Sequence, residues 1–315
     1  MHSETKRKLT ESELSSITRR ATGAGLVEHF ELTDGMFNAA HRLTTDDGRV
    51  VVLKVAPPPG TPLMTYERDI MRTEAMAFRL MGEHGVPVPE VLHVEDGLLV
   101  MSCLDGGSWA SLEQRITPGA RAALRRELGG IVARLHRIGG DSFGYPQGPG
   151  GDTWRGAFLA MAASVLADAE VFGVGLPEGL SDWFQDRSAV LDEVTTPVLV
   201  HFDLWPGNIF VDPATPEVVG IIDPERAFWG DPLADFVSLA LFGDIEDEPD
   251  FLAGYGGMDM TPSRRERVRL YRVYLYLIMI VEGAPRGFVG AEHEESRRFY
   301  RGKLAADLAG DPAGE

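Results

Sequence analysis

Hydrophobic and polar residues alternate along the first third of the chain, and this two-residue period is typical of β-strands with one buried face. Turn sequences such as Asp34-Gly35, Asp46-Asp47-Gly48 and Asp96-Gly97 separate the alternating segments. A wider apolar spacing predicts helices over 11–20 and 66–83. The strands predicted by the alternation are 30–43, 50–55, 91–94 and 98–101.

The pattern changes after Thr117, where apolar residues recur at helical spacing over long segments. A loop rich in glycine and proline, 139–151, separates the first two of these segments. We therefore predict an α+β fold with two lobes, a β-rich lobe over 1–104 and a mostly helical lobe over 105–315, with the ligand site in the cleft between them. The predicted helices of the second lobe are 118–138, 153–170, 178–192, 231–243 and 263–283.

Three short apolar runs in the second lobe read as strands, and polar residues follow them. Asp203 and Asn208 lie in the tight Pro206-Gly207 loop between the first two runs, and Asp223 directly follows the third. Short strands joined in this way would bring the three side chains to one edge. The runs are 198–200, 209–211 and 218–222.

This spacing has a chemical meaning, because it matches a kinase catalytic loop followed by its metal-binding aspartate. Phosphoryl transfer needs one carboxylate to accept a hydroxyl proton, and hard oxygen ligands to hold Mg²⁺ on the phosphates. We predict the first role for Asp203 and the second for Asn208 and Asp223. The chain contains only two asparagines, Asn38 and Asn208, so asparagine is not used here as ordinary loop filler.

Lys54 lies in the apolar strand 50–55, where an unpaired ammonium would be costly to bury. We predict that Lys54 binds the α- and β-phosphates and is held by a carboxylate of the following helix. Glu74 is the expected partner, and Glu67 and Glu83 are the alternatives at either end of that helix.

Two further segments of the first lobe are candidates for nucleotide contacts. The hairpin around Gly35 and Asn38 precedes Lys54 and could cover the phosphates with backbone N–H groups, although it lacks a G-x-G-x-x-G motif. The end of strand 98–101 could bind adenine through the Ser102 carbonyl and the Leu104 N–H, with Met101 as a wall.

Several other residues are predicted to be structural. His201 is expected to hydrogen-bond loop backbone, and His136 is expected to be a paired helix histidine. Asp231 and Asp235 are expected to brace the catalytic loop rather than to bind metal. Cys103, the only cysteine, is expected to be a small buried hydrophobe rather than a reactive thiol.

Composition narrows the class of protein. A single cysteine, a polar N-terminus without a signal peptide and no apolar run long enough to span a bilayer all favour the cytoplasm and argue against membrane insertion. The net charge of −18 argues against nucleic acid as a partner and would suit a cationic small molecule, or it serves solubility alone. The sequence does not set the oligomeric state.

Taken in order, these motifs resemble the aminoglycoside phosphotransferase and choline-kinase-like family of small-molecule kinases. The resemblance implies a protein-kinase-like fold with Mg²⁺ and ATP, or GTP, in the cleft. It also implies that Asp203 is the catalytic base and that Asn208 and Asp223 are metal ligands. The matching residues are Val52-Leu53-Lys54, Glu74, Leu99-Val100-Met101-Ser102, Leu135-His136, His201-x-Asp203-x4-Asn208 and Ile222-Asp223-x7-Asp231-Pro232-x2-Asp235.

The chain also departs from the usual family pattern. Phe202 replaces the glycine of His-Gly-Asp, and it is expected either to change the loop backbone or to line one side of the acceptor pocket. Trp205 and Pro224 are features shared with fructosamine-kinase relatives. The leading hypothesis is a kinase that phosphorylates a hydroxyl of an antibiotic. The alternatives are a kinase for a fructosamine, a sugar or another metabolite, and a nucleotide-binding protein without catalysis.

Overall fold

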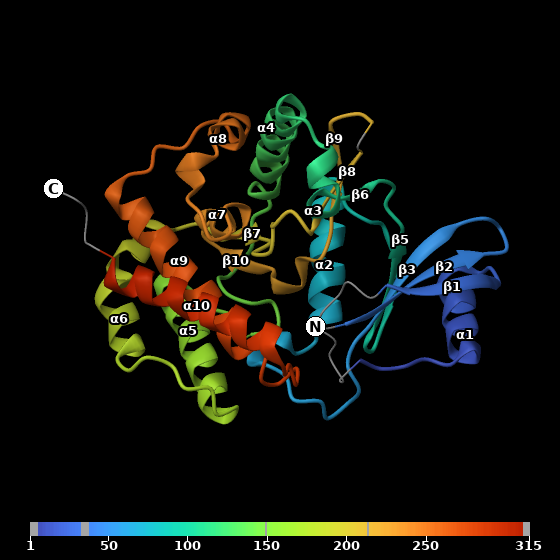
Figure 1. Cartoon of the computed structure of the whole chain (residues 1–315), viewed down its shortest axis with the longest axis horizontal. Coiled ribbons are helices and arrows are strands. Elements are labelled where there is room, and N and C mark those ends of the chain that lie inside the picture. Colours follow the sequence, from blue (N-terminus) through green and yellow to red (C-terminus); the bar gives the residue numbers. More distant parts are fainter. Residues whose placement is uncertain (1–5, 33–37, 149, 213, 311–315) are drawn as a thin grey trace.

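The computed structural model describes residues 6–32, 38–148, 150–212 and 214–310, and it confirms the predicted α+β fold (Figure 1). An antiparallel five-stranded sheet in the order β1-β2-β3-β5-β4 forms the N-terminal part, and helices dominate the remainder. The strands of this sheet are β1 (Leu26–Leu32), β2 (Ala39–Thr45), β3 (Val50–Val55), β4 (Val91–Glu95) and β5 (Leu98–Ser102).

Helices cover both faces of this sheet, which explains why the residues of the central strand β3 are apolar on both faces, with Lys54 as the exception. The face with Val51 and Leu53 packs with α1 (Glu11–Thr22), whose first turn is closed by a Thr10–Glu13 capping box. The opposite face packs with α2 (Ile70–Glu83). Because side chains alternate along a strand, Lys54 projects toward the α2 face.

Two small sheets in the C-terminal part hold the loops of the predicted site. In the first sheet β10 pairs with β7, and in the second the order is β6-β8-β9. The N-terminal sheet ends with Ser102 of β5, and the next strand, β6, pairs with β8 of the C-terminal part. The predicted boundary between the lobes, after residue 104, stays a prediction. These strands are β6 (Gly107–Ser108), β7 (Val198–Val200), β8 (Ile209–Asp212), β9 (Glu217–Ile221) and β10 (Phe228–Gly230).

The long helix α9 (Pro262–Val281) lies at the centre of the helical region, and nearly all of its second half is buried. α4 and α9 both begin with Thr-Pro, where the threonine caps the helix and proline occupies its first position. The other helices are α3 (Trp109–Leu112), α4 (Pro118–Leu135), α5 (Trp154–Val171), α6 (Leu180–Arg187), α7 (Leu233–Leu239), α8 (Pro249–Tyr255) and α10 (Ala291–Ala309).

The helical boundaries differ from the predicted ones in three places, and in the first of these α4 ends at Leu135 instead of at residue 138. The predicted helix 178–192 ends as α6 at Arg187 and continues as the 3₁₀ segment Ser188–Glu193, and α7 is shorter than 231–243. The sequence did not predict α8 or α10, since each buries few side chains and so shows only a weak apolar stripe. Within the ranges given above, no helix is long and apolar enough to cross a membrane.

Candidate active site

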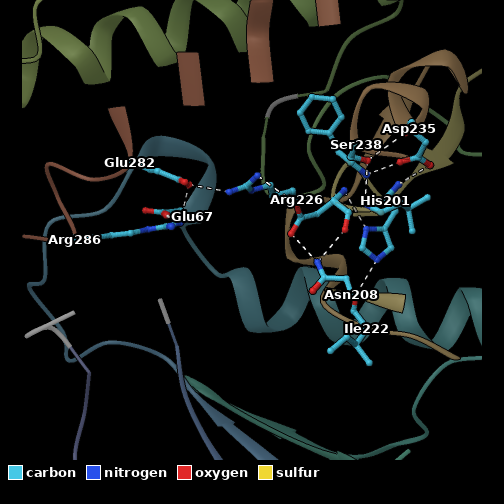
Figure 2. Close-up of polar contacts among 12 residues, drawn as sticks. Glu67, His201, Asn208, Ile222, Arg226, Asp235, Ser238, Glu282 and Arg286 are labelled. Atoms are coloured by element: carbon cyan, nitrogen blue, oxygen red, sulfur yellow. Dashed lines mark hydrogen bonds and ion pairs between the residues drawn. The ribbon is translucent and has the colours of Figure 1, made fainter. Parts of the chain in front are cut away.

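The backbone of the loop between β7 and β8 is held by side chains of α7. The Asp235 carboxylate accepts the N–H of His201 at 3.1 Å and that of Phe202 at 2.6 Å (Figure 2). The Ser238 hydroxyl accepts the N–H of Leu204 at 2.9 Å. These contacts satisfy buried donors of a loop that has no ladder partner, and they confirm the bracing role predicted for Asp235.

His201 connects this loop to the strand that delivers Asp223. Its Nδ1 accepts the N–H of Asp203 at 3.2 Å, so its Nε2 carries the proton that it donates to the Ile222 carbonyl at 3.1 Å (Figure 2). Burial lowers the pKa of His201, while Asp235 opposes this shift. The ring is therefore a neutral structural bridge, as predicted.

Two neighbouring predictions have different outcomes. Both ring nitrogens of His136 have hydrogen-bond partners: Nδ1 lies 2.8 Å from the Tyr255 hydroxyl, and Nε2 lies 2.9 Å from the Asp235 carboxylate. These contacts confirm His136 as a paired histidine. Asp231 does not brace the catalytic loop. It accepts the Leu233 N–H at 3.0 Å and the Tyr271 hydroxyl at 2.7 Å, so it fixes the start of α7 against α9.

Phe202 occupies the position where glycine was expected, and its backbone adopts a left-handed φ of 62°. Its side chain is fully buried, with ring centroids 5.1 Å from Phe228 and 5.7 Å from Tyr274. Burial in this aromatic cluster offsets the strain of the left-handed backbone. The expectation that Phe202 lines the acceptor pocket is wrong, because its ring is buried in the core. The expected change of the loop backbone stays a prediction, since glycine also adopts a left-handed φ.

The Asp203 carboxylate lies in a mixed environment of donors and charges. Its Oδ2 accepts the Asn208 amide at 2.8 Å, and its Oδ1 lies 3.5 Å from the Arg226 guanidinium. Burial raises the pKa of Asp203, Arg226 opposes this shift, and Asp223 adds to it. A carboxylate with a raised pKa is the stronger base and binds a proton more readily, as a general base requires.

Lys54 pairs with Glu74, its predicted partner, and also with Asp223, which was predicted only as a metal ligand. Its ammonium lies 2.7 Å from Glu74 of α2 and 2.5 Å from Asp223 at the end of β9. Burial raises the pKa of Glu74 to about 7, and Lys54 opposes that shift. Burial also opposes ionisation of Asp223, yet Lys54 holds the pKa of Asp223 below its ordinary value. Glu67 and Glu83, the alternative partners, lie elsewhere: Glu67 pairs with Arg286, and Glu83 is exposed.

Carboxylates gather around Asp223 in a way that suits a divalent cation. One oxygen of each of Glu74, Asp223 and Glu225 lies within 4.8 Å of the others, and hard oxygen ligands are what Mg²⁺ prefers. Burial, followed by the charge of Asp223, raises the pKa of Glu225 well above its ordinary value. Asn208 donates through its amide nitrogen to the carbonyl and the carboxylate of Asp203, which leaves the amide oxygen for another partner.

The remaining predicted nucleotide contacts lie along the junction of the two regions. Asn38 is buried and donates its amide to Glu225 at 2.9 Å, while Gly35 lies outside the described residues. Met101 belongs to the small core between the sheet and α2, and the half-buried Leu104 packs against Gly220 of β9. The Ser102 N–H donates to the Glu90 carbonyl at 2.9 Å, and the Ser102 hydroxyl accepts the Glu90 N–H at 2.8 Å.

Cys103 is half-buried rather than buried, which corrects the expectation for it. It lies in the linker between β5 and β6, where the chain leaves the core of the sheet. Its thiol approaches the Leu104 carbonyl at 3.6 Å, a weak contact that gives it no evident activation.

Several charged residues of the site were not predicted. Glu225 and Arg226 follow Asp223 directly, and their place after a buried strand was the available signal. Glu282 and Arg286 come from the end of α9 and beyond, and with Glu67 they form a buried set of ion pairs around Arg226 (Figure 2). Nothing in the sequence connects these distant positions.

The amino-acid sequence is similar to those of known phosphotransferases. The probable ketoamine kinase of Thermus thermophilus is 29% identical over 248 residues, which cover 78% of this chain and 85% of that protein. The aminoglycoside 3'-phosphotransferase of Streptomyces fradiae is 26% identical over 264 residues, covering 76% and 93%.

A solved structure extends the similarity to nearly the whole chain. An aminoglycoside phosphotransferase in complex with ADP and hygromycin B superposes with a TM-score of 0.66 at 18% identity, over 95% of this chain and all of that one. Residues 31–271 match the model of the phosphotransferase enzyme family, APH. The chain therefore belongs to this family and is a small-molecule phosphotransferase.

Proposed function

We propose that the protein transfers the γ-phosphoryl group of ATP to a hydroxyl group of a small molecule. One observation carries the proposal: Lys54, Glu74 and Asp223 meet in one ion-pair cluster, and Asn208 and Asp203 bond each other beside it. These are the parts that phosphoryl transfer by positioning and charge stabilisation requires.

In the proposed step the acceptor oxygen bonds to the γ-phosphorus while the bond from that phosphorus to the bridging oxygen of ADP breaks. The electron pair of the broken bond leaves with ADP, and the hydroxyl proton passes to Asp203. Lys54 would orient the α- and β-phosphates. Asn208 and Asp223 would hold Mg²⁺, which when bound offsets the negative charge of the phosphates.

The adenine and phosphate contacts are proposed on the same basis. Ser102 and Leu104 would present backbone groups to the base beside Met101, and the segment with Gly35 and Asn38 would cover the phosphates. The bond from Asn38 to Glu225 supports this, since it brings Asn38 next to the residues that follow Asp223.

The rest of the acceptor would occupy a cavity of about 420 Å³, whose lining residue Tyr274 packs against Phe202, next to Asp203 in the chain. Rings of Tyr66, Tyr145 and Tyr274 line it, and burial raises the pKa of each phenol while the charge of Arg226 opposes the rise. Asp168 also lines the cavity, but its carboxylate already accepts the N–H and the hydroxyl of Thr65 at 2.8 Å. Aromatic walls suit the apolar faces of a sugar ring, and Arg68, which also lines the cavity, disfavours a polycation there.

Among acceptors we therefore favour a ketoamine, and an aminoglycoside antibiotic is the second candidate. Two acidic residues of the helical region are already paired and so attract a polycation less: Asp192 lies 2.6 Å from Arg155, and Glu193 lies 2.7 Å from Arg267. The ketoamine kinase relative supports the first candidate, and the aminoglycoside phosphotransferase relative supports the second.

The test is ADP release with Mg²⁺ and ATP against fructosyl-lysine, kanamycin and hygromycin B, with product mass measured for each. We expect Asp203→Asn to lower kcat on the order of 10²–10⁴-fold while ATP still binds, because it removes the proton acceptor. Asp212→Asn, at the far end of β8, is the control and should retain activity. Full turnover by Asp203→Asn would refute the role of this carboxylate.

A further inference from the structure

Arg226 lies between two carboxylates and is closer to one of them. Its Nη2 donates to Glu282 at 2.8 Å, whereas its Nη1 lies 3.5 Å from Oδ1 of Asp203 (Figure 2). Only 9% of its side chain is exposed, so the guanidinium has little access to water as a competing partner. The position of Arg226 is therefore set by the balance between Glu282 and Asp203.

Glu282 is in turn held from its other side. Arg286, one turn further on, lies 3.1 Å from Glu282 and 2.7 Å from Glu67 (Figure 2). Glu67 ends the 3₁₀ segment that precedes α2. The buried set therefore alternates in charge from Asp203 through Arg226, Glu282 and Arg286 to Glu67, with three carboxylates and two guanidinium groups.

We propose that Glu282 is a positioning residue for phosphoryl transfer: by binding Arg226 it keeps the guanidinium from closing onto Asp203, so that Oδ1 stays free to accept the hydroxyl proton. The proposal rests on the function proposed above for Asp203. It assigns no contact between Glu282 and substrate, and Glu282 acts only through Arg226.

The physical reason is competition for a buried charge. A charge-assisted hydrogen bond at 2.8 Å is stronger than a contact at 3.5 Å, so Glu282 is the dominant partner. If Glu282 lost its charge, Arg226 would have one close anion left, and a buried guanidinium without a partner is costly. It would then pair fully with Oδ1, while Oδ2 already accepts the Asn208 amide.

The test uses Glu282→Gln in the full-length protein. Four charges would remain in the set and balance one another, so we expect the variant to fold. With the acceptor that the ADP-release test identifies, we expect kcat to fall by about 10–100-fold, because general-base catalysis is partly lost. KM for ATP should change by less than about 3-fold, since the nucleotide contacts are untouched. A crystal structure of the variant should show Arg226 at hydrogen-bond distance from Oδ1.

Glu67→Gln is the matched control. It removes a buried carboxylate from the same set of ion pairs, but the carboxylate of Glu282 keeps two oxygens, enough to bind Arg226 and Arg286 together. We expect it to lower the melting temperature as Glu282→Gln does, yet to keep kcat within about 3-fold of the wild type. A purely structural role for the set would instead make both variants lose kcat alike.

Three results would overturn the proposal: wild-type kcat in Glu282→Gln, an equal loss of kcat in Glu67→Gln, or an unchanged distance from Arg226 to Asp203 in the variant crystal. If Glu282→Gln does not fold, Glu282→Asp decides, with a lower kcat at unchanged KM supporting the proposal and wild-type kcat overturning it. If the wild type turns over no acceptor, the proposed function fails, and the crystallographic distance still decides the positioning.

Discussion

Asp223 and Phe202 show at the residue scale how local strain is used at this site. Both adopt left-handed backbone angles, with φ of 67° and 62°, although neither is glycine. Such a conformation costs on the order of 1–2 kcal/mol per residue. It persists at Asp223 because Lys54 binds the carboxylate, and at Phe202 because Asp235 accepts its N–H and the ring is buried.

His41 gives a prediction about pH at the same scale. It is buried on β2, and neither ring nitrogen has a hydrogen-bond partner among the described residues. Burial lowers the pKa of His41 below its ordinary value of 6.5, Glu31 opposes this shift, and His29 and Lys6 add to it. The unfolded chain therefore binds more protons below about pH 6.5, and stability falls as the pH falls.

The measurement is urea unfolding at pH 7.5 and pH 5.5 for the wild type and for His41→Leu. Leucine continues the apolar row of Ala39 and Leu43, both of which are buried on the same strand. We expect the variant to lose less stability on acidification than the wild type. An equal loss in both proteins would contradict the assignment.

At the element scale, α4 and α8 pack closely because glycines remove side chains from their contact. A Cβ on Gly129 would overlap the Phe251 carbonyl oxygen, and a Cβ on Gly254 would overlap that of Arg126. At Gly130, the next residue of α4, a Cβ would lie 3.8 Å from its nearest neighbour, the Gly254 oxygen. The close approach of α4 and α8 therefore requires glycine at position 129, which faces α8, but not at position 130.

Gly129→Ala should destabilise the protein by about 1–3 kcal/mol, since the added methyl must push two helix backbones apart. Gly130→Ala should be neutral or stabilise by up to about 1 kcal/mol, because alanine favours a helix and finds space there. Urea denaturation of both variants measures the difference. Equal effects of the two substitutions would show that the helices can separate without cost.

At the scale of the whole molecule, polar contacts join the N-terminal sheet region to the helical region around the proposed nucleotide site. Lys54 meets Asp223, Asn38 meets Glu225, and Glu67 meets Arg286. Each pair combines one residue from each region. A ligand that binds between them should therefore stabilise both together.

We accordingly expect Mg²⁺ and ATP to raise the melting temperature. At 100 times the dissociation constant, binding to the folded state alone adds about 2.7 kcal/mol. Asp223→Ala should abolish the increase, because it removes a proposed metal ligand, and chelation of Mg²⁺ should do the same to the wild type. Glu246→Gln, in an exposed ion pair with Arg265, should retain the full increase. A wild-type response in Asp223→Ala would exclude that carboxylate from the nucleotide site.

The sequence by itself determined the parts that depend on short-range geometry. Strands of a few residues flank the loop with Asp203 and Asn208, and another, β9, ends two residues before Asp223, so local chain length brings these residues together. Lys54 was identifiable because a lysine in an apolar strand needs a partner, and Glu74 follows on the next helix. The α+β fold followed from the change of apolar period along the chain.

Only the tertiary structure decided which distant charges meet. Arg226 is separated by 56 residues from Glu282, and Arg286 by 219 residues from Glu67. With 30 basic and 48 acidic residues, the sequence offers many equivalent ion pairs and no local rule to choose among them. The packing of the end of α9 near the segment before α2 makes the choice, because buried charges must find partners where the backbone places them.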